Sequence, residues 1–108
     1  MKAKAALLSL LLASPAWANP ISLGDLTLPI TGVFAEYGVQ AGFYLPPNAP
    51  PALTQCANGV MYISLETPAG KATYAGLLAA KTAGWHVVRI TFTRNQAGSC
   101  TVDSLHFN

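Results

Sequence analysis

Charged residues are scarce in this 108-residue sequence, and their scarcity restricts what the chain can bind. It contains only six lysines and arginines and four acidic residues. Two of the basic residues, Lys2 and Lys4, stand at the very start, and without them four charges of each sign remain. A neutral chain lacks the basic surface on which nucleic-acid binding depends, so we predict no nucleic-acid partner. Because 52% of the residues are hydrophobic, apolar patches and self-association are expected instead.

The residue patterns that reactive sites require are also missing. Two cysteines and two histidines are too few and too scattered for a metal site, and the nine glycines form no phosphate-binding loop. No spacing singles out a pair among the four carboxylates for acid–base chemistry. Ser104 and His106 share a face of the last predicted strand, but no nucleophile-elbow sequence surrounds them, so a small hydrolase is a disfavoured hypothesis. We predict a protein that is not an enzyme and uses no cofactor or metal.

The first eighteen residues have the pattern of a cleavable signal peptide. Lys2 and Lys4 precede an apolar run over residues 5–13, and small residues end the segment at Ala16-Trp17-Ala18, an A-x-A cleavage site. The apolar run is shorter than the roughly 20 residues of a membrane span. We therefore predict export to the periplasm or the medium, with no membrane span after cleavage and one domain over residues 19–108.

The two cysteines, Cys56 and Cys100, suit an oxidising compartment. Only one intramolecular pairing exists, and a bridge over this separation should stabilise the fold by about 2–4 kcal/mol. A disulfide between two chains is the alternative. A domain of this length buries only about 60–65% of its unfolded surface, so a bridge would compensate for a small core.

The alternation of apolar and polar residues predicts extended segments. Met61, Ile63 and Leu65 share one face of a segment whose other face holds Tyr62 and Ser64. Similar patterns, bounded by glycine and proline, predict five strands over residues 25–37, 39–45, 60–66, 86–94 and 100–107, the first two forming a hairpin that turns near Gly38.

One helix is predicted over residues 68–83, between the third and fourth strands. Thr67 suits the N-cap, Pro68 the first helical position and Gly84 the left-handed residue after the last turn. This order of elements is that of an OB-like barrel. The predicted fold is α+β, a five-stranded, mostly antiparallel OB-like barrel.

Residues 46–51, the run PPNAPP, are predicted to form an extended loop, because proline lacks an N–H donor and has a restricted φ angle. The loop is the basis of an alternative hypothesis for function. The chain would then be a monomeric periplasmic accessory or inhibitor protein that caps a partner with this loop.

Exposed aromatic residues are the best candidates for a binding site. Tyr37, Tyr44, Tyr62 and Trp85 fall at the ends of predicted elements or on their outer face, where flat rings can stack on sugars or on partner proteins. For each of them, packing at the rim of the core is the alternative interpretation.

The segment from Cys56 to Phe107 resembles small exported bacterial proteins, the B subunits of AB5 toxins of the subtilase-cytotoxin and typhoid-toxin type. The resemblance lies in a cysteine, an aromatic strand, the helix TPAGKATYAGLLAAKTAG, the strand HVVRITF and the closing strand CTVDSLHF. Those subunits have an OB fold, form pentamers and bind glycans. The resemblance therefore implies an OB fold, a homo-oligomer that would be a pentamer, and a glycan or protein ligand.

Overall fold

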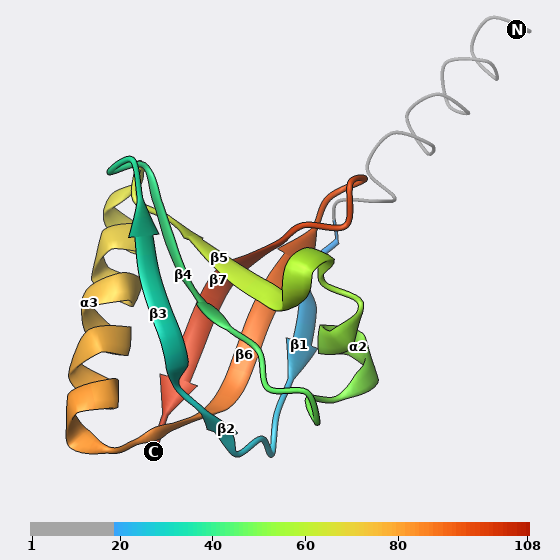
Figure 1. The fold of residues 1–108 in the computed structure, drawn as a ribbon, viewed down its shortest axis with the longest axis horizontal. Helices are drawn as coiled ribbons and strands as arrows, with labels where there is room; N and C mark the ends of the chain where they lie inside the picture. Colours follow the sequence, from blue (N-terminus) through green and yellow to red (C-terminus); the bar gives the residue numbers. More distant parts are fainter. Residues whose placement is uncertain (1–18) are drawn as a thin grey trace, which may run out of the picture.

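Seven strands form one open, mostly antiparallel sheet in the computed structural model, which describes residues 19–108 (Figure 1). Neighbouring strands follow the order β1-β6-β7-β5-β4-β3, and β2 also pairs with β6. The pair β5–β7 is parallel and the other pairs are antiparallel. The strands are β1 (Ile21–Leu23), β2 (Leu28–Pro29), β3 (Thr31–Glu36), β4 (Gln40–Tyr44), β5 (Val60–Ser64), β6 (His86–Arg94) and β7 (Cys100–Phe107). The predicted signal peptide, residues 1–18, lies outside the described residues.

The predicted α+β class is confirmed, as are the second to fifth strands within two residues at each end. The first predicted strand, residues 25–37, is wrong as one continuous element. Asp25 and Gly32 both have positive φ angles, 54° and 60°, which interrupt extended pairing. Pro29 has no N–H to give to a neighbouring strand, so β2 ends there after two residues. This part of the chain is divided into β1, β2 and β3.

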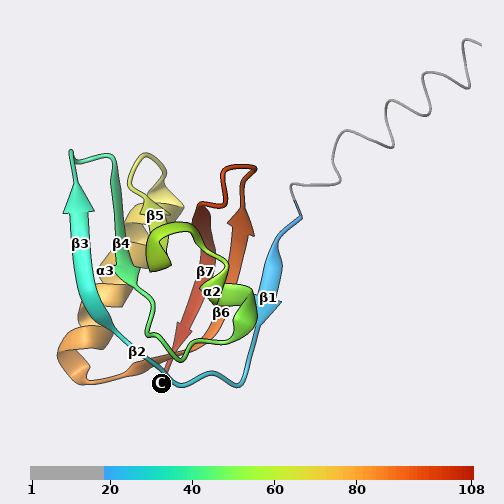
Figure 2. The same cartoon turned by 45° about the vertical axis from the view of Figure 1, so that its right-hand side comes forward.

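The predicted closed five-stranded barrel is also wrong, because the sheet is open. The edge of β6 that β3 would need for closure is occupied by β1 and β2, with Ile21 opposite Phe92 and Leu28 opposite Val87. The chain passes from β2 to β3 through the single residue Ile30. The two end strands of the sheet, β3 and β1, lie on opposite sides of the molecule (Figure 2).

The predicted helix is confirmed as α3 (Pro68–Ala83). Its ends follow from local chemistry. The Thr67 hydroxyl accepts a hydrogen bond from the Gly70 N–H at 3.0 Å, and Gly84 ends the helix in the left-handed conformation. Leu77 and Ala80 on α3 are buried against the sheet, where the helix contacts β5 and β7. None of the helices in residues 19–108 is long and apolar enough to cross a membrane.

The predicted extended loop over residues 46–51 is only partly correct. Pro51 begins a helical turn, α2 (Pro51–Thr54), and a 3-10 turn, η1 (Ala57–Gly59), follows. Proline suits the first helical position because its missing N–H is not needed there. The Pro50 carbonyl accepts hydrogen bonds from the N–H groups of Leu53 and Thr54. Leu53 is fully buried, so α2 covers part of the core.

The core lies on one face of the sheet, between the strands and the helices. On β4 and β5, alternate residues point into it, namely Ala41, Phe43, Met61 and Ile63. The largest fully buried side chains are Phe43, Phe92, Leu53, Met61, Ile63, Leu77, Ile90 and Val87. The residues between them on β4 and β5 therefore point to the opposite, outer face.

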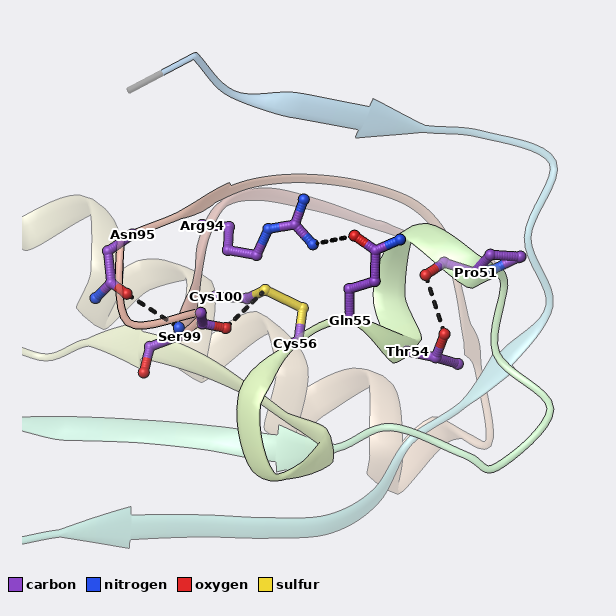
Figure 3. The surroundings of a disulfide bond; sticks show 9 residues. Pro51, Thr54, Gln55, Cys56, Arg94, Asn95, Ser99 and Cys100 are labelled. Atoms are coloured by element: carbon purple, nitrogen blue, oxygen red, sulfur yellow. Dashed lines mark hydrogen bonds between the residues drawn. A yellow bond between two sulfur atoms is a disulfide. The ribbon is translucent and has the colours of Figure 1, made fainter. Parts of the chain in front are cut away.

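The predicted disulfide between Cys56 and Cys100 is present, with a Cα–Cα distance of 5.4 Å (Figure 3). It joins the segment between α2 and η1 to the first residue of β7. Both cysteines are buried. Beside the bridge, Arg94 Nη1 donates to Gln55 Oε1 at 2.6 Å, which links the last residue of β6 to the residue that ends α2.

Candidate functional site

Three aromatic rings meet on the outer face of β3, β4 and β5. Phe34 lies between Tyr44 and Tyr62, with centroid distances of 5.5 Å and 5.9 Å. The rings of Phe34 and Tyr62 meet edge to face at 88°. These distances and orientations are favourable for aromatic pairs. None of these three residues belongs to the buried core: Tyr44 is half exposed, and Phe34 and Tyr62 are partly buried.

Two glycines make this arrangement sterically feasible. Gly42 lies opposite Phe34 on one side and Tyr62 on the other, so the three residues form one row across the sheet. A Cβ atom at Gly42 would lie 2.9 Å from Phe34 Cζ, closer than atoms pack. A Cβ at Gly32 would overlap the ring of Tyr44. The rings therefore lie directly over glycine backbone.

A small pocket of about 160 Å³ opens beside the ring of Tyr62. Its walls come from β4, β5 and β7, which are neighbours in the sheet (Figure 1), and from Val39 and Glu66, just before β4 and just after β5. Gln40 lies opposite Ser64, and Tyr62 lies beside Thr101 across the parallel pair. The lining residues are Val39, Gln40, Tyr62, Ser64, Glu66 and Thr101. An aromatic ring thus lies next to an amide, two hydroxyls and a carboxylate.

Local hydrogen bonds hold the end of β5 in place at the pocket. The Glu66 N–H donates to Ser64 Oγ at 3.2 Å, and the Leu65 N–H donates to the Val39 carbonyl at 2.9 Å. The Ser64 oxygen already accepts one hydrogen bond, and its own O–H remains a donor for a ligand. The pocket therefore offers donors as well as acceptors.

The structure brings together two of the four predicted binding residues. Tyr62 lines the pocket and Tyr44, which is half exposed, belongs to the same aromatic group. Tyr37 is 94% exposed at the turn between β3 and β4. Trp85 lies elsewhere, between α3 and β6, and is about half exposed. Tyr37 and Trp85 are therefore not part of the pocket wall.

Sequence reasoning did not select the polar residues of the pocket. The alternation on residues 60–66 does place Ser64 and Glu66 on the face of Tyr62, so these two could have been included. Thr101 could not, because its position depends on the parallel pairing of β5 with β7, which are separated by α3 and β6. Phe34 was not selected because residues 25–37 were predicted as one continuous strand, without the bulge between Thr31 and Phe34.

The two sites that the sequence disfavoured, a hydrolase site at Ser104 and His106 and a metal site, are not completed by other residues in the described part of the chain. Ser104 and His106 lie opposite Thr91 and Arg89, and the nearby carboxylate of Asp103 accepts a hydrogen bond from Thr93 at 2.7 Å. Within residues 19–108, no three histidine, cysteine or acidic side chains are grouped so that they could hold a metal ion.

The proline-rich segment packs against the molecule instead of projecting freely. Ala49 is buried, and Pro46 and Pro50 are half-buried, whereas Pro47 and Asn48 are exposed. The Ala49 N–H also donates to the Pro46 carbonyl at 3.1 Å. Removing residues 46–51 would thus disturb the packing that leads into α2.

In comparisons with known proteins, no family model, no curated protein and no solved structure matches this chain. The resemblance to toxin B subunits therefore stays a prediction from the sequence.

Proposed function

We propose that this chain is an exported, non-enzymatic binding domain that binds a glycan on the outer face of β3, β4 and β5. The observation that carries the proposal is the pocket beside Tyr62. There a partly buried aromatic ring adjoins a hydroxyl-, amide- and carboxylate-lined hollow on the face opposite the core.

The groups of this pocket match the chemistry of a sugar ring. One face of a pyranose carries mainly C–H groups, which pack against an aromatic ring such as Tyr62. The edge of a pyranose carries hydroxyls that both donate and accept hydrogen bonds. Gln40 and the hydroxyls of Ser64 and Thr101 can do both as well, and the Glu66 carboxylate accepts.

The size of the pocket limits what enters it. Pockets for drug-sized ligands have volumes of about 300–1,000 Å³. At about 160 Å³, this pocket takes a single sugar residue, with the rest of a glycan lying along the rings of Phe34 and Tyr44. One such contact is weak. The predicted homo-oligomer would present several pockets and raise the overall affinity through multivalency.

Export is supported by the cysteine pair. Cys56 and Cys100 form a disulfide, as expected for a chain that works in an oxidising compartment. The bridge and the signal-peptide pattern of residues 1–18 favour the same location, the periplasm or the medium.

A glycan array tests the proposal. The chain would be expressed with its own leader, purified in the oxidised form and compared with Tyr62→Ala and Tyr62→Phe. We expect Tyr62→Ala to abolish glycan binding and Tyr62→Phe to retain it, because only the first variant removes the stacking ring. Trp85→Ala is the matched control, since it removes an exposed ring outside the pocket.

The outcome that contradicts the proposal is equally definite. If the wild type binds no glycan, or if Tyr62→Ala binds as well as the wild type while remaining folded by circular dichroism, the pocket is not a glycan site.

A further inference from the structure

One carboxylate lines the pocket beside Tyr62, and two more lie on neighbouring strands of the sheet. Glu66 is the one charged residue among the six that line it. A second carboxylate belongs to Glu36 on β3, which lies directly opposite the pocket residue Gln40. Residues opposite each other on neighbouring strands share a face of the sheet, so Glu36 lies on the outer face next to the pocket.

A third carboxylate lies on β7, two residues along the strand from the pocket residue Thr101. Asp103 Oδ2 accepts a hydrogen bond from Thr93 Oγ1 at 2.7 Å. Thr93 lies opposite Thr101, which is itself part of the pocket wall. Three of the four acidic residues in the sequence are therefore grouped around this one face.

The basic residues do not balance this charge at the pocket. Lys81 Nζ donates to the Ile30 carbonyl at 3.3 Å, and Arg94 is held by Gln55 beside the disulfide (Figure 3). Arg89 lies further along β6, opposite His106. Lys71 lies exposed on the first turn of α3, after Glu66, and forms no ion pair with a carboxylate of the described residues. None of the basic residues in the described part of the chain is among those lining the pocket. The six lining residues therefore carry one negative charge and no positive charge.

We infer that this pocket selects an uncharged sugar residue over an acidic one, with Glu66 as the specificity-determining residue. This inference rests on the proposed glycan-binding function and deepens it. A carboxylate on the ligand would lie near Glu66, and none of the lining residues supplies a cation to offset the repulsion. A neutral sugar instead gives hydroxyl donors to the Glu66 oxygens, and hydrogen bonds to a charged acceptor are the stronger kind.

The hydrogen-bond donors of the pocket argue against a positively charged ligand as the main occupant. An ammonium group has donors only. It would leave the N–H groups of Gln40 and the O–H groups of Ser64 and Thr101 without acceptors from the ligand. Sugar hydroxyls supply acceptors to these donors and a donor to Glu66, so an uncharged sugar satisfies both kinds of group.

The test compares immobilised sugars that differ in one substituent: a hexose, the corresponding uronic acid and the corresponding hexosamine, presented at equal density. We expect the full chain to bind the hexose at least about fivefold more tightly than the uronic acid at low salt, as repulsion at close range in water supplies that factor. The ratio should shrink at about 1 M salt, where the Debye length is only about 3 Å.

Two variants assign the effect to one residue. Glu66→Gln keeps the shape of the side chain and removes its charge, so the ratio of hexose to uronic acid binding should fall towards one. Asp25→Asn is the matched control, because it removes the same charge from an exposed residue between β1 and β2, and it should leave the ratio unchanged.

The outcomes separate the two proposals. Equal or stronger binding of the uronic acid overturns the selectivity while the glycan-binding function stands. A preference for the hexosamine over the hexose also overturns it, in favour of recognition of an ammonium group. An unchanged ratio in Glu66→Gln overturns the assignment to Glu66. If none of the three sugars binds and the glycan array is also negative, the proposed function itself fails.

Discussion

Phe34 meets Tyr62 edge to face across the backbone of Gly42, with ring centroids 5.9 Å apart. The contact links the exposed end strand β3 to the strand that carries the pocket. It exists only because the residue between the two rings has no side chain. The proposed binding face therefore depends on the absence of a side chain at Gly42 as well as on the three rings.

The first prediction concerns this glycine. Gly42→Ala would place a Cβ 2.9 Å from Phe34 Cζ and against the Met61 carbonyl, so the ring and the backbone must shift. We expect a loss of about 1–3 kcal/mol in the free energy of unfolding, measured by denaturant titration, together with weaker glycan binding. Gly76→Ala is the control, because its nearest neighbour would be 3.6 Å away and alanine favours helix. Equal stabilities for the two variants would contradict the close packing.

The second prediction concerns the turn between β3 and β4. Tyr37 has a positive φ of 53° and is 94% exposed, so its ring gains little from packing while its backbone is strained. Asparagine tolerates this conformation better, so Tyr37→Asn should raise the free energy of unfolding by about 1 kcal/mol. Tyr37→Ala removes the ring but keeps the penalty, and it should leave the stability nearly unchanged. A destabilised Tyr37→Asn variant would show that the ring makes contacts that stabilise the fold.

The third prediction concerns α2. Leu53 is fully buried although it follows the proline-rich run, so Leu53→Ala should cost about 2–5 kcal/mol in thermal or denaturant unfolding. The neighbouring exposed residue offers a control, and Thr54→Ala should change stability by less than about 1 kcal/mol. If Leu53→Ala is as stable as the wild type, α2 does not anchor the end of the proline-rich run. Residues 46–51 would then be a free loop, which favours the alternative hypothesis that the chain caps a partner protein with this loop.

The fourth prediction concerns the disulfide. Replacing both Cys56 and Cys100 by alanine should reduce the free energy of unfolding by about 2–4 kcal/mol. Wild-type chain in a strong reductant should show a similar loss, because both treatments remove the same cross-link. The measurement is urea unfolding of oxidised, reduced and variant proteins. Coinciding unfolding curves for all three would mean that the bridge contributes nothing to stability.

The fifth prediction concerns the helix start. Thr67 accepts a hydrogen bond from the Gly70 N–H, so Thr67→Ala should cost about 1 kcal/mol. Thr73 lies within the same helix and bonds to the Ala69 carbonyl, a group that the helix already uses. Thr73→Ala should therefore be neutral or slightly stabilising. The comparison is made by thermal unfolding, and a larger loss at Thr73 than at Thr67 would contradict the capping role.

Features governed by neighbouring residues could be predicted from the sequence. Thr67, Pro68 and Gly84 bound the helix correctly because capping depends on groups within one turn. The alternation from Met61 to Leu65 identified a strand with one buried face because side chains point to alternate sides. The only two cysteines of the chain form the disulfide, as their number had suggested.

The candidate site could be predicted only in part. Alternation placed Tyr62 on an outer face, Tyr44 was selected near the end of a predicted strand, and both belong to the aromatic group. Their grouping through Phe34 depends on the register of β3 with β4, which a bulge between Thr31 and Phe34 shifts. A shift of one residue moves every side chain to the other face, so this outcome could not be read from the pattern alone.

By itself the sequence determined where α3 and the last four predicted strands begin and end, which of their faces are apolar and which cysteines can pair, because each depends on short-range stereochemistry or on composition. The tertiary structure alone decided that β1 and β2 occupy the edge of β6, leaving the sheet open, and that β5 runs parallel to β7, placing Thr101 beside Tyr62. Pairing between distant strands depends on which edges meet during packing, and local propensity does not specify that choice.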